Sequence, residues 1–366
     1  MWKNKPNNKK ITEENAITSH GYIMIAVLLL LSLAMIIVTQ IYRNGRIQTQ
    51  FDKIFIQREK AKLLALNGLA LAYSQLYVSQ QFETNAAEKK ASDDQKKDTP
   101  DPIITFLENV LPYLNQSRTI KLKKEFDNIE GTIDVCISCE EGKIPINLIY
   151  NFENKKFINA ETEQFIKTLF SNLKQFVSDK DLFNLFEKFL KERQYKVNDP
   201  TELLTIQEFQ EAFRGNIFYE PTHITMKKKK SIYLMDIFTV WSNKAYINPW
   251  FISNSLAALL QFKQSHELPI NDRKKVISEI LKTFKKSTNL KETWNTSLKK
   301  VYGKDFQSLP KGLTQILREI IPPRFFSIVS SGTFGDTTQK LYAIIEKHES
   351  KNEIATLFSV KRLYWI

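Results

Sequence analysis

The sequence predicts an α+β protein in which a long N-terminal helix packs on an antiparallel sheet and a large all-α insertion separates the strands. Near the N-terminus an apolar stretch passes into an amphipathic one without an intervening proline, which predicts one long helix. Segments in which apolar and polar residues alternate lie at 119–148 and again after residue 324. The block between them has apolar residues three and four positions apart, which is the helical period.

The composition is that of a folded, basic protein. The chain has 366 residues, a formal net charge of +13 and 42% hydrophobic residues, enough for one or two packed domains and too much for a disordered polymer. Ten glycines exclude a collagen-like chain, and two cysteines exclude a disulfide-stapled miniprotein. The lysines are scattered, without the interleaved arginines and aromatic residues that stack bases. We therefore expect no nucleic-acid partner.

Residues 22–42 form a charge-free apolar stretch interrupted only by Ser32, Thr39 and Gln40. A helix of this length extends about 31 Å, which matches the hydrocarbon thickness of a bilayer. A secretory signal peptide has a shorter apolar region of about 7–15 residues, and no small-x-small cleavage pattern follows before Arg43. The stretch therefore predicts a single transmembrane span with membrane lipid as a partner. Basic residues flank it on both sides, so charge alone does not decide its orientation.

The helix is expected to continue through residues 43–82, where single glycines are the only breakers. Apolar side chains recur there at three- and four-residue steps and predict one packing face. That face consists of Leu66, Leu69, Ala70, Tyr73, Leu76 and Tyr77. Residues 83–102 are polar, charged and proline-terminated, which is typical of a solvated, flexible linker.

The remaining chain alternates between strand and helix patterns. Residues 103–150 are predicted to begin the α+β domain with a short helix and an antiparallel meander, whose third strand is 144–148. After them we expect a helical insertion at 151–230, a returning strand at 231–242 with a second helical segment up to 320, and closing antiparallel strands at 321–366. The glycine-containing segment 332–338 is expected to be a hairpin turn.

Several motifs along the chain resemble one protein family. A polar, lysine-bearing leader ends in Ser19, His20 and Gly21, and the apolar stretch starts at Tyr22. Further motifs are an Arg-Glu-Lys-Ala start of an alanine- and leucine-rich helix at 58–77, an acidic glycine turn at 139–148, a Thr-Glu-Leu segment at 199–204 and an Asn-Pro-Trp junction at 246–250. In this order they resemble the K-type minor pseudopilins of the type II secretion system (the general secretion pathway protein K family), which belong to the type IV pilin-like superfamily.

This resemblance implies that the N-terminus is processed. A prepilin peptidase would remove the leader, residues 1–21, by cutting after Gly21, and would methylate the new terminal amine at Tyr22. Most pilin-like subunits carry a glutamate at the fifth mature position, which is Ala26 here. That glutamate is a carboxylate in hydrocarbon that must be neutralised by the terminal amine of a neighbouring subunit. A subunit at the fibre tip does not need this contact, and the K-type subunit typically lacks the glutamate.

Two departures from the family pattern limit what the resemblance implies. Some K-type members bind calcium at an acidic cluster in the helical insertion, but the matching segment here, 186–192, has lysines between its glutamates. Calcium needs about six to eight oxygen ligands, so we expect no metal there. Pro145 and Pro249 stand where the family has asparagine, which changes the local hydrogen bonding.

The sequence offers no constellation typical of an enzyme. Its four histidines are far apart and lack the spacing of a zinc site. Cys136 and Cys139 form a C-x-x-C pair, but the pattern places it at a strand end, whereas a catalytic pair needs a helix N-terminus to lower the thiol pKa. In an oxidising periplasm these cysteines could close a local disulfide; two unpaired, partly buried thiols are the alternative. We expect no catalytic residue, no cofactor and no small-molecule substrate.

These observations favour a non-enzymatic, single-pass protein of the inner membrane with its C-terminal domain in the periplasm. The function that the resemblance implies is a minor pseudopilin that caps the tip of a type II secretion pseudopilus and takes part in protein export across the outer membrane. Its expected partners are other minor pseudopilins and the prepilin peptidase. The alternative is a membrane-anchored periplasmic adaptor or binding module unrelated to pilins, which would retain its leader.

Overall fold

The computed structural model describes residues 10–89, 102–177, 180–219, 231–242, 245–263, 270–282, 289–319, 323–348 and 357–366. The chain divides into two compact units, Met1–Glu59 and Lys60–Ile366. Helix α1 (Lys10–Lys89) contributes to both, and the other helices and strands belong to the second unit. Residues 1–9 of the expected leader and 90–101 of the expected linker lie outside the described residues.

In the first unit, α1 exposes its apolar side chains. Every side chain from 22 to 56 is exposed. The polar side chains of the apolar stretch bond to the helix itself, since Ser32 Oγ donates to Leu29 O (2.8 Å) and Thr39 Oγ1 donates to Met35 O (2.7 Å). By length and composition this helix can cross a membrane. The structure therefore contains the apolar helix of spanning length that the sequence predicts.

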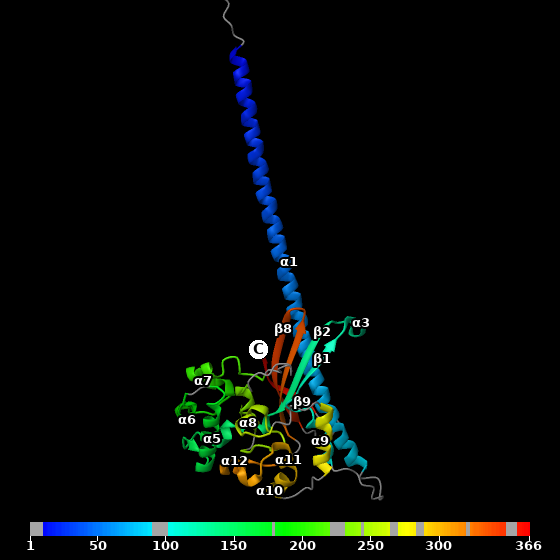
Figure 1. Cartoon of the computed structure of the whole chain (residues 1–366), viewed down its shortest axis with the longest axis vertical. Helices are drawn as coiled ribbons and strands as arrows, with labels where there is room; N and C mark the ends of the chain where they lie inside the picture. Colours follow the sequence, from blue (N-terminus) through cyan, green and yellow to red (C-terminus); the bar gives the residue numbers. More distant parts are fainter. Residues whose placement is uncertain are drawn as a thin grey trace, which may run out of the picture. The chain divides into compact units, whose positions relative to one another are not determined.

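The second unit is built on a five-stranded antiparallel sheet with the strand order β1-β2-β7-β8-β9 (Figure 1). Its strands are β1 (Ser117–Leu122), β2 (Gly131–Cys139), β7 (Phe325–Phe334), β8 (Thr337–His348) and β9 (Leu357–Trp365). Phe334 pairs with Thr337, so β7 and β8 join through a tight turn in which Gly335 has a left-handed φ of +56°. The predicted antiparallel sheet is confirmed, and segment 332–338 contains the predicted hairpin turn.

The second half of α1 packs on this sheet at very short range. A Cβ atom added at Gly332 of β7 would lie 2.2 Å from Ala61 O and 2.5 Å from Ala65 N. On the same strand, Ser330 Oγ donates a hydrogen bond of 2.7 Å to Ala65 O. The helix backbone therefore touches the strand backbone, which only the absence of a side chain at Gly332 permits.

The packing face of α1 differs from the predicted one. Leu69 and Leu76 are buried as expected and Tyr73 is half-buried against the core, but Leu66 and Ala70 are exposed, and the side chain of Tyr77 lies outside the described part. The buried face consists of Ala61, Leu64, Ala65, Gly68, Leu69, Ala72 and Leu76. The prediction followed large apolar side chains, whereas close packing of a helix on a sheet also selects small ones.

Between β2 and β7 the chain forms a group of short helices next to the sheet (Figure 1). The α-helices of this group are α4 (Ile146–Ile149), α5 (Ala160–Leu173), α6 (Leu182–Glu192), α7 (Gln207–Ala212), α8 (Asn254–Leu259), α9 (Ile270–Lys282), α10 (Leu290–Thr293), α11 (Lys299–Tyr302) and α12 (Lys311–Ile316). Tighter turns lie at η1 (Glu140–Gly142), η2 (Pro200–Thr205), η3 (Leu234–Asp236) and η6 (Phe306–Ser308), and η5 (Trp294–Leu298) is π-helical. Outside the group, α2 (Pro102–Val110) precedes β1, and α3 (Lys124–Asp127) connects β1 to β2.

Short strand pairs within this group correct the predicted strand boundaries. β3 (Ile144–Pro145) pairs in parallel with β6 (Phe238–Thr239), and β4 (Tyr150–Asn151) pairs with β5 (Lys156–Phe157). The predicted third meander strand at 144–148 is wrong, because β7 lies beside β2 and the chain turns into α4 at Ile146. The predicted returning strand at 231–242 is reduced to β6, since its apolar residues are buried on all sides and lack a strand period.

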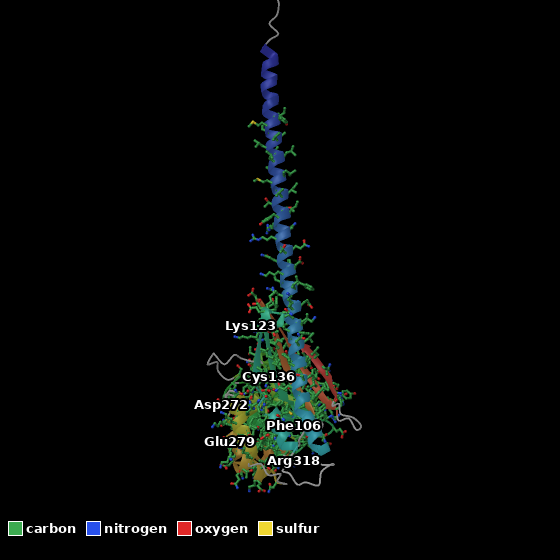
Figure 2. All side chains as sticks on the ribbon, turned by 90° about the vertical axis from the view of Figure 1, so that its right-hand side faces the viewer. Phe106, Lys123, Cys136, Asp272, Glu279 and Arg318 are labelled. Atoms are coloured by element: carbon green, nitrogen blue, oxygen red, sulfur yellow. The ribbon has the colours of Figure 1, made fainter. Side chains whose placement is uncertain are left out.

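The helices of the insertion follow from caps and apolar stripes. At α5, Asn159 caps the first turn by accepting from Thr162 N (2.7 Å). The buried stripe of α5 carries Phe165, Ile166, Leu169, Phe170 and Leu173. Figure 2 shows Lys123, which precedes α3, at one end of the second unit and Arg318, which follows α12, at the other. Sheet and helices share one continuous apolar core between these ends.

Candidate functional site

The N-terminal residues singled out in the sequence lie on α1 in the first unit. Gly21 and Tyr22 are consecutive helical residues, and Ala26 follows about one turn later. The side chains of Tyr22 and Ala26 are exposed, and no charged residue follows Tyr22 before Arg43. We call residues 22–42 the apolar segment. A helix that is apolar all round is stable in a bilayer or against other apolar helices.

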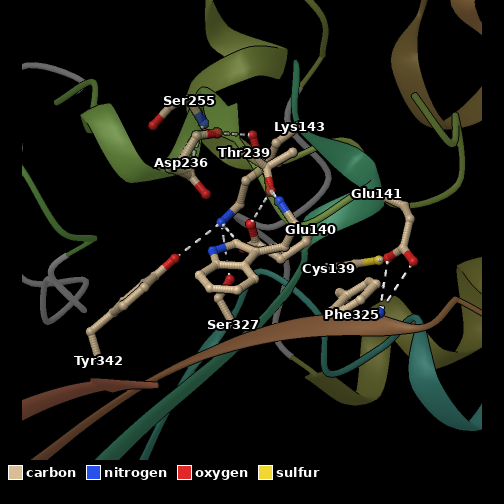
Figure 3. Close-up of polar contacts among 12 residues, drawn as sticks. Cys139, Glu140, Glu141, Lys143, Asp236, Thr239, Ser255, Phe325, Ser327 and Tyr342 are labelled. Atoms are coloured by element: carbon tan, nitrogen blue, oxygen red, sulfur yellow. Dashed lines mark hydrogen bonds and ion pairs between the residues drawn. The ribbon is translucent and has the colours of Figure 1, made fainter. Parts of the chain in front are cut away.

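Where β2 ends and the helical insertion begins, polar side chains are buried in the core (Figure 3). We call these residues the junction cluster; they are Glu140, Lys143, Asp236, Thr239, Ser327 and Tyr342. Lys143 forms an ion pair with Glu140 and donates hydrogen bonds to Ser327 Oγ (3.0 Å) and Tyr342 Oη (3.4 Å). Thr239 donates to the other oxygen of Glu140 over 2.5 Å. The cluster thus joins the insertion to β7 and β8.

Burial and charge act in opposite directions on the pKa of Lys143. Burial lowers the pKa of an ammonium group, but the Glu140 carboxylate raises it, and the net effect is a pKa above the ordinary 10.5. For Asp236, burial raises the pKa and the nearby Lys143 only partly offsets this. The raised pKa favours the protonated, ion-paired form of Lys143. The arrangement fits a structural role, in which the ion pair holds the insertion against β7 and β8.

A second buried carboxylate, that of Glu141, also connects the insertion to the sheet. Glu141 accepts hydrogen bonds from the backbone N–H groups of Arg324 (2.8 Å) and Phe325 (3.1 Å), where β7 begins. The backbone of the same turn is also bonded, because Asn248 N–H donates to Glu141 O over 2.7 Å. Burial raises the pKa of Glu141, and these hydrogen bonds lower it only in part. The single turn that follows β2 therefore holds both the start of β7 and the segment before α8 in place.

Cys136 and Cys139 are free thiols in the structure and pack into different apolar clusters. Residues three apart on a strand point to opposite faces, so a disulfide between them requires this end of β2 to rearrange. Burial raises the pKa of Cys136 to about 12 and that of Cys139 well above its ordinary value. Such thiols are poor nucleophiles. The local disulfide stays a prediction, which a mass measurement under oxidising conditions decides.

The segment 186–192, which matches the family's acidic cluster, lies on α6. Glu187 pairs with Lys191 (2.7 Å) and Glu192 with Lys188 (3.8 Å), each one helical turn apart. Nowhere in the described part of the chain do three His, Cys, Asp or Glu side chains form a group that could hold a metal ion. That segment 186–192 binds no calcium stays a prediction, and it rests on this charge pattern.

Proline positions 145 and 249 have backbone roles. Pro145 belongs to the short strand β3. The carbonyl of Pro249 accepts a hydrogen bond from the buried Tyr302 hydroxyl (2.5 Å), while the preceding Asn248 accepts from Trp250 N (3.1 Å). The Asn-Pro-Trp junction is therefore a hydrogen-bonded turn within the core.

Sequence reasoning missed the junction cluster. The pattern Glu-Glu-Gly-Lys after a strand is typical of a solvated turn, yet Glu140, Glu141 and Lys143 are all at most 5% exposed. The available signal is that Ile144 and Ile146, directly after the charges, alternate as core residues do. A sequence pattern cannot place Ser327 and Tyr342, more than 180 residues away, beside Lys143.

Comparisons with known proteins give a likeness in fold. No family model and no curated protein matches the chain. Among solved structures, the chain is similar in fold to a chain of the crystal structure of the GspK-GspI-GspJ complex from the enterotoxigenic Escherichia coli Type 2 Secretion System. The identity is 11%, the match covers 88% of this chain and 99% of that one, and the TM-score is 0.42. At that level the likeness carries no conclusion about function.

Proposed function

We propose that this chain is a minor pseudopilin-like subunit of a type II secretion system, which takes part in protein export across the outer membrane. The observation that carries the proposal is the character of α1, which is apolar and exposed over residues 22–42 and packs against an antiparallel sheet from Ala61 onward. An exposed apolar helix needs a bilayer or neighbouring apolar helices. A subunit that moves from the membrane into a fibre exchanges the bilayer for the apolar helices of neighbouring subunits.

The proposal includes processing of the N-terminus and a location. The prepilin peptidase removes residues 1–21, and Tyr22 becomes the methylated N-terminus. The apolar segment then holds the chain in the inner membrane with the second unit in the periplasm. The resemblance of the leader and of the Gly21–Tyr22 boundary to the family supports this step.

Ala26 supports a position at the fibre tip. A carboxylate within hydrocarbon is costly unless a neighbouring charge neutralises it. A subunit with another subunit above it gains from such a carboxylate, whereas the last subunit has no such neighbour. We infer that this chain occupies the tip, where its helical insertion blocks the addition of a further subunit and contacts other minor pseudopilins.

A structural rather than enzymatic role agrees with the buried titratable groups. Lys143, Glu140 and both cysteines are held in the core by hydrogen bonds or packing. Groups at such depth position the insertion on the sheet and do not meet a substrate.

Intact-mass analysis of the full chain, co-expressed with a prepilin peptidase, tests the processing step. We expect the mass to fall by that of residues 1–21 and to rise by one methyl group. Gly21→Leu is expected to keep the leader, and Gly45→Leu, which changes a glycine with open space around it, is expected to be processed normally. Retention of the leader in the unaltered chain would favour the membrane-anchored adaptor.

Gold labelling tests the tip position. Lys188 on α6 is exposed, so Lys188→Cys offers a reactive thiol while the native cysteines stay buried. In assembled fibres we expect thiol-reactive gold at one end of each fibre. Labels spaced along the whole fibre would refute the tip position and leave the pseudopilin assignment standing.

A further inference from the structure

A cavity of about 330 Å³ lies in the second unit between the segment that follows α2, the helices α9 and α11, and α8 with the segment before it. Its size falls in the range of pockets that hold small molecules. The wall is largely aliphatic and includes Leu111, Leu114, Ile252, Ile277, Leu298 and Val301. The cavity is separate from the junction cluster, whose residues do not line it.

One buried cation lines this cavity without a partner. Arg273 on α9 is 8% exposed, and its Nε and Nη1 atoms, both buried, have no hydrogen-bond partner among the residues that the structure describes. No ion pair of Arg273 is found in that part of the chain either. Buried guanidinium groups are normally paired with carboxylates or phosphates, because an unpaired buried charge is costly.

The charged side chains that line the cavity have one sign. Lys263 and Lys300 also line it, and no Asp or Glu occurs among the described lining residues. The acidic residues of α9 do not compensate, since Asp272 and Glu279 are exposed and lie at the outer edge of the helix (Figure 2). The charged side chains that line the cavity are therefore all basic, and its walls are largely apolar.

We propose that this cavity binds a small apolar carboxylate, an unbranched hydrocarbon chain whose carboxylate meets Arg273. Guanidinium groups bind carboxylates through directed, charge-assisted hydrogen bonds. A peptide fits the walls less well, because its amide groups would lie against Leu and Ile side chains without hydrogen-bond partners. A medium-chain fatty acid has one polar end and no amide.

Equilibrium dialysis of radiolabelled octanoate against the full chain in lipid nanodiscs tests this site, with empty nanodiscs as the blank. We expect saturable binding of one octanoate per chain, which unlabelled octanoate displaces and octan-1-ol does not. Arg273→Met is expected to weaken binding about tenfold or more, because a charged hydrogen bond is lost. Lys275→Met removes the same charge from an exposed position of the same helix and is expected to change binding less than about twofold.

A thermal melt without ligand separates recognition from a structural role. An unpaired buried charge is unfavourable, so Arg273→Met is expected to melt no lower than the unaltered chain. Val276→Trp, which keeps Arg273 and narrows the cavity from a half-exposed position, is expected to abolish octanoate binding while the chain stays folded. Unchanged binding in Arg273→Met, equal displacement by octan-1-ol, or a lower melting temperature of Arg273→Met would each overturn the proposal.

Discussion

Replacing Gly332 by alanine is expected to destabilise the second unit by about 2–4 kcal/mol. The new Cβ would lie 2.2 Å from Ala61 O and 2.5 Å from Ala65 N, so α1 must move away from β7 by about 1 Å or more to restore van der Waals distance. Overpacking of this kind costs about 1–3 kcal/mol. The same movement breaks the Ser330–Ala65 hydrogen bond of 2.7 Å, which adds about 1 kcal/mol.

Differential scanning calorimetry of the full chain measures this effect. In large domains about 1 kcal/mol corresponds to about 2 °C, so the melting temperature of the second unit should fall by about 4–8 °C. Gly45→Ala is the matched control, since no atom lies within 4 Å of an added Cβ at Gly45; alanine there should leave the second unit unchanged and favour the helix by up to about 1 kcal/mol. An unchanged melting temperature for Gly332→Ala would show that α1 does not contact β7 as described.

Three further predictions concern buried charges and the apolar segment. Lys143→Met leaves Glu140 buried without its ion pair and should lower the free energy of unfolding in denaturant by about 3–5 kcal/mol. The double variant that also carries Glu140→Gln should regain most of this stability, and a double variant as unstable as Lys143→Met would refute the pairing. Because burial raises the pKa of Glu141 above its ordinary 4.5, the folded state binds the proton more tightly, so this group's contribution to stability is fully present below about pH 4.5 and is lost as the pH rises through the raised pKa. In thermal melts, the stability of the unaltered chain relative to that of Glu141→Gln should therefore decrease as the pH rises from 4.5. A relative stability that does not change with pH would contradict this. Ala26→Glu should reduce the carbonate-resistant membrane fraction less than Ala34→Glu, because a carboxylate one turn from the end of the span lies nearer the interface and costs less than one at mid-span, which costs about 2.5–3.5 kcal/mol; equal losses would place the span elsewhere.

The long elements could be predicted from the sequence because each repeats one period over many residues. The apolar run before Arg43 and the alternation in β7 to β9 are signals of this kind. The pairing of β3 with β6 could not be predicted, since it involves two residues per strand and a parallel neighbour far along the chain. The packing face of α1 was predicted incorrectly for a related reason. Which residues of the helix are buried depends on how closely the sheet approaches it, and Gly332 sets that distance.

The polar sites were not predictable because burial of a charge is decided by distant residues. Glu140 and Lys143 follow one another in the sequence as surface charges do, and only β7 and β8 make them core residues. Arg273 stands between Asp272 and Lys274 in a stretch typical of a solvated helix face. Its burial follows from how α9 packs on the rest of the second unit, which no local pattern encodes.

The way the insertion is attached explains how the α1–sheet framework can carry it. Cys139, the last residue of β2, pairs with Phe326 near the start of β7, so the insertion leaves and re-enters the sheet at one place. At this place the side chain of Glu141 accepts hydrogen bonds from the backbone N–H groups of Arg324 and Phe325 and so links the two ends of the insertion. Because lengthening a loop whose ends are already fixed adds little entropic cost, helices can be added there without disturbing the register of β2 with β7. In the function proposed above, the α1–sheet framework would serve assembly and the inserted helices would supply the surface that ends a fibre.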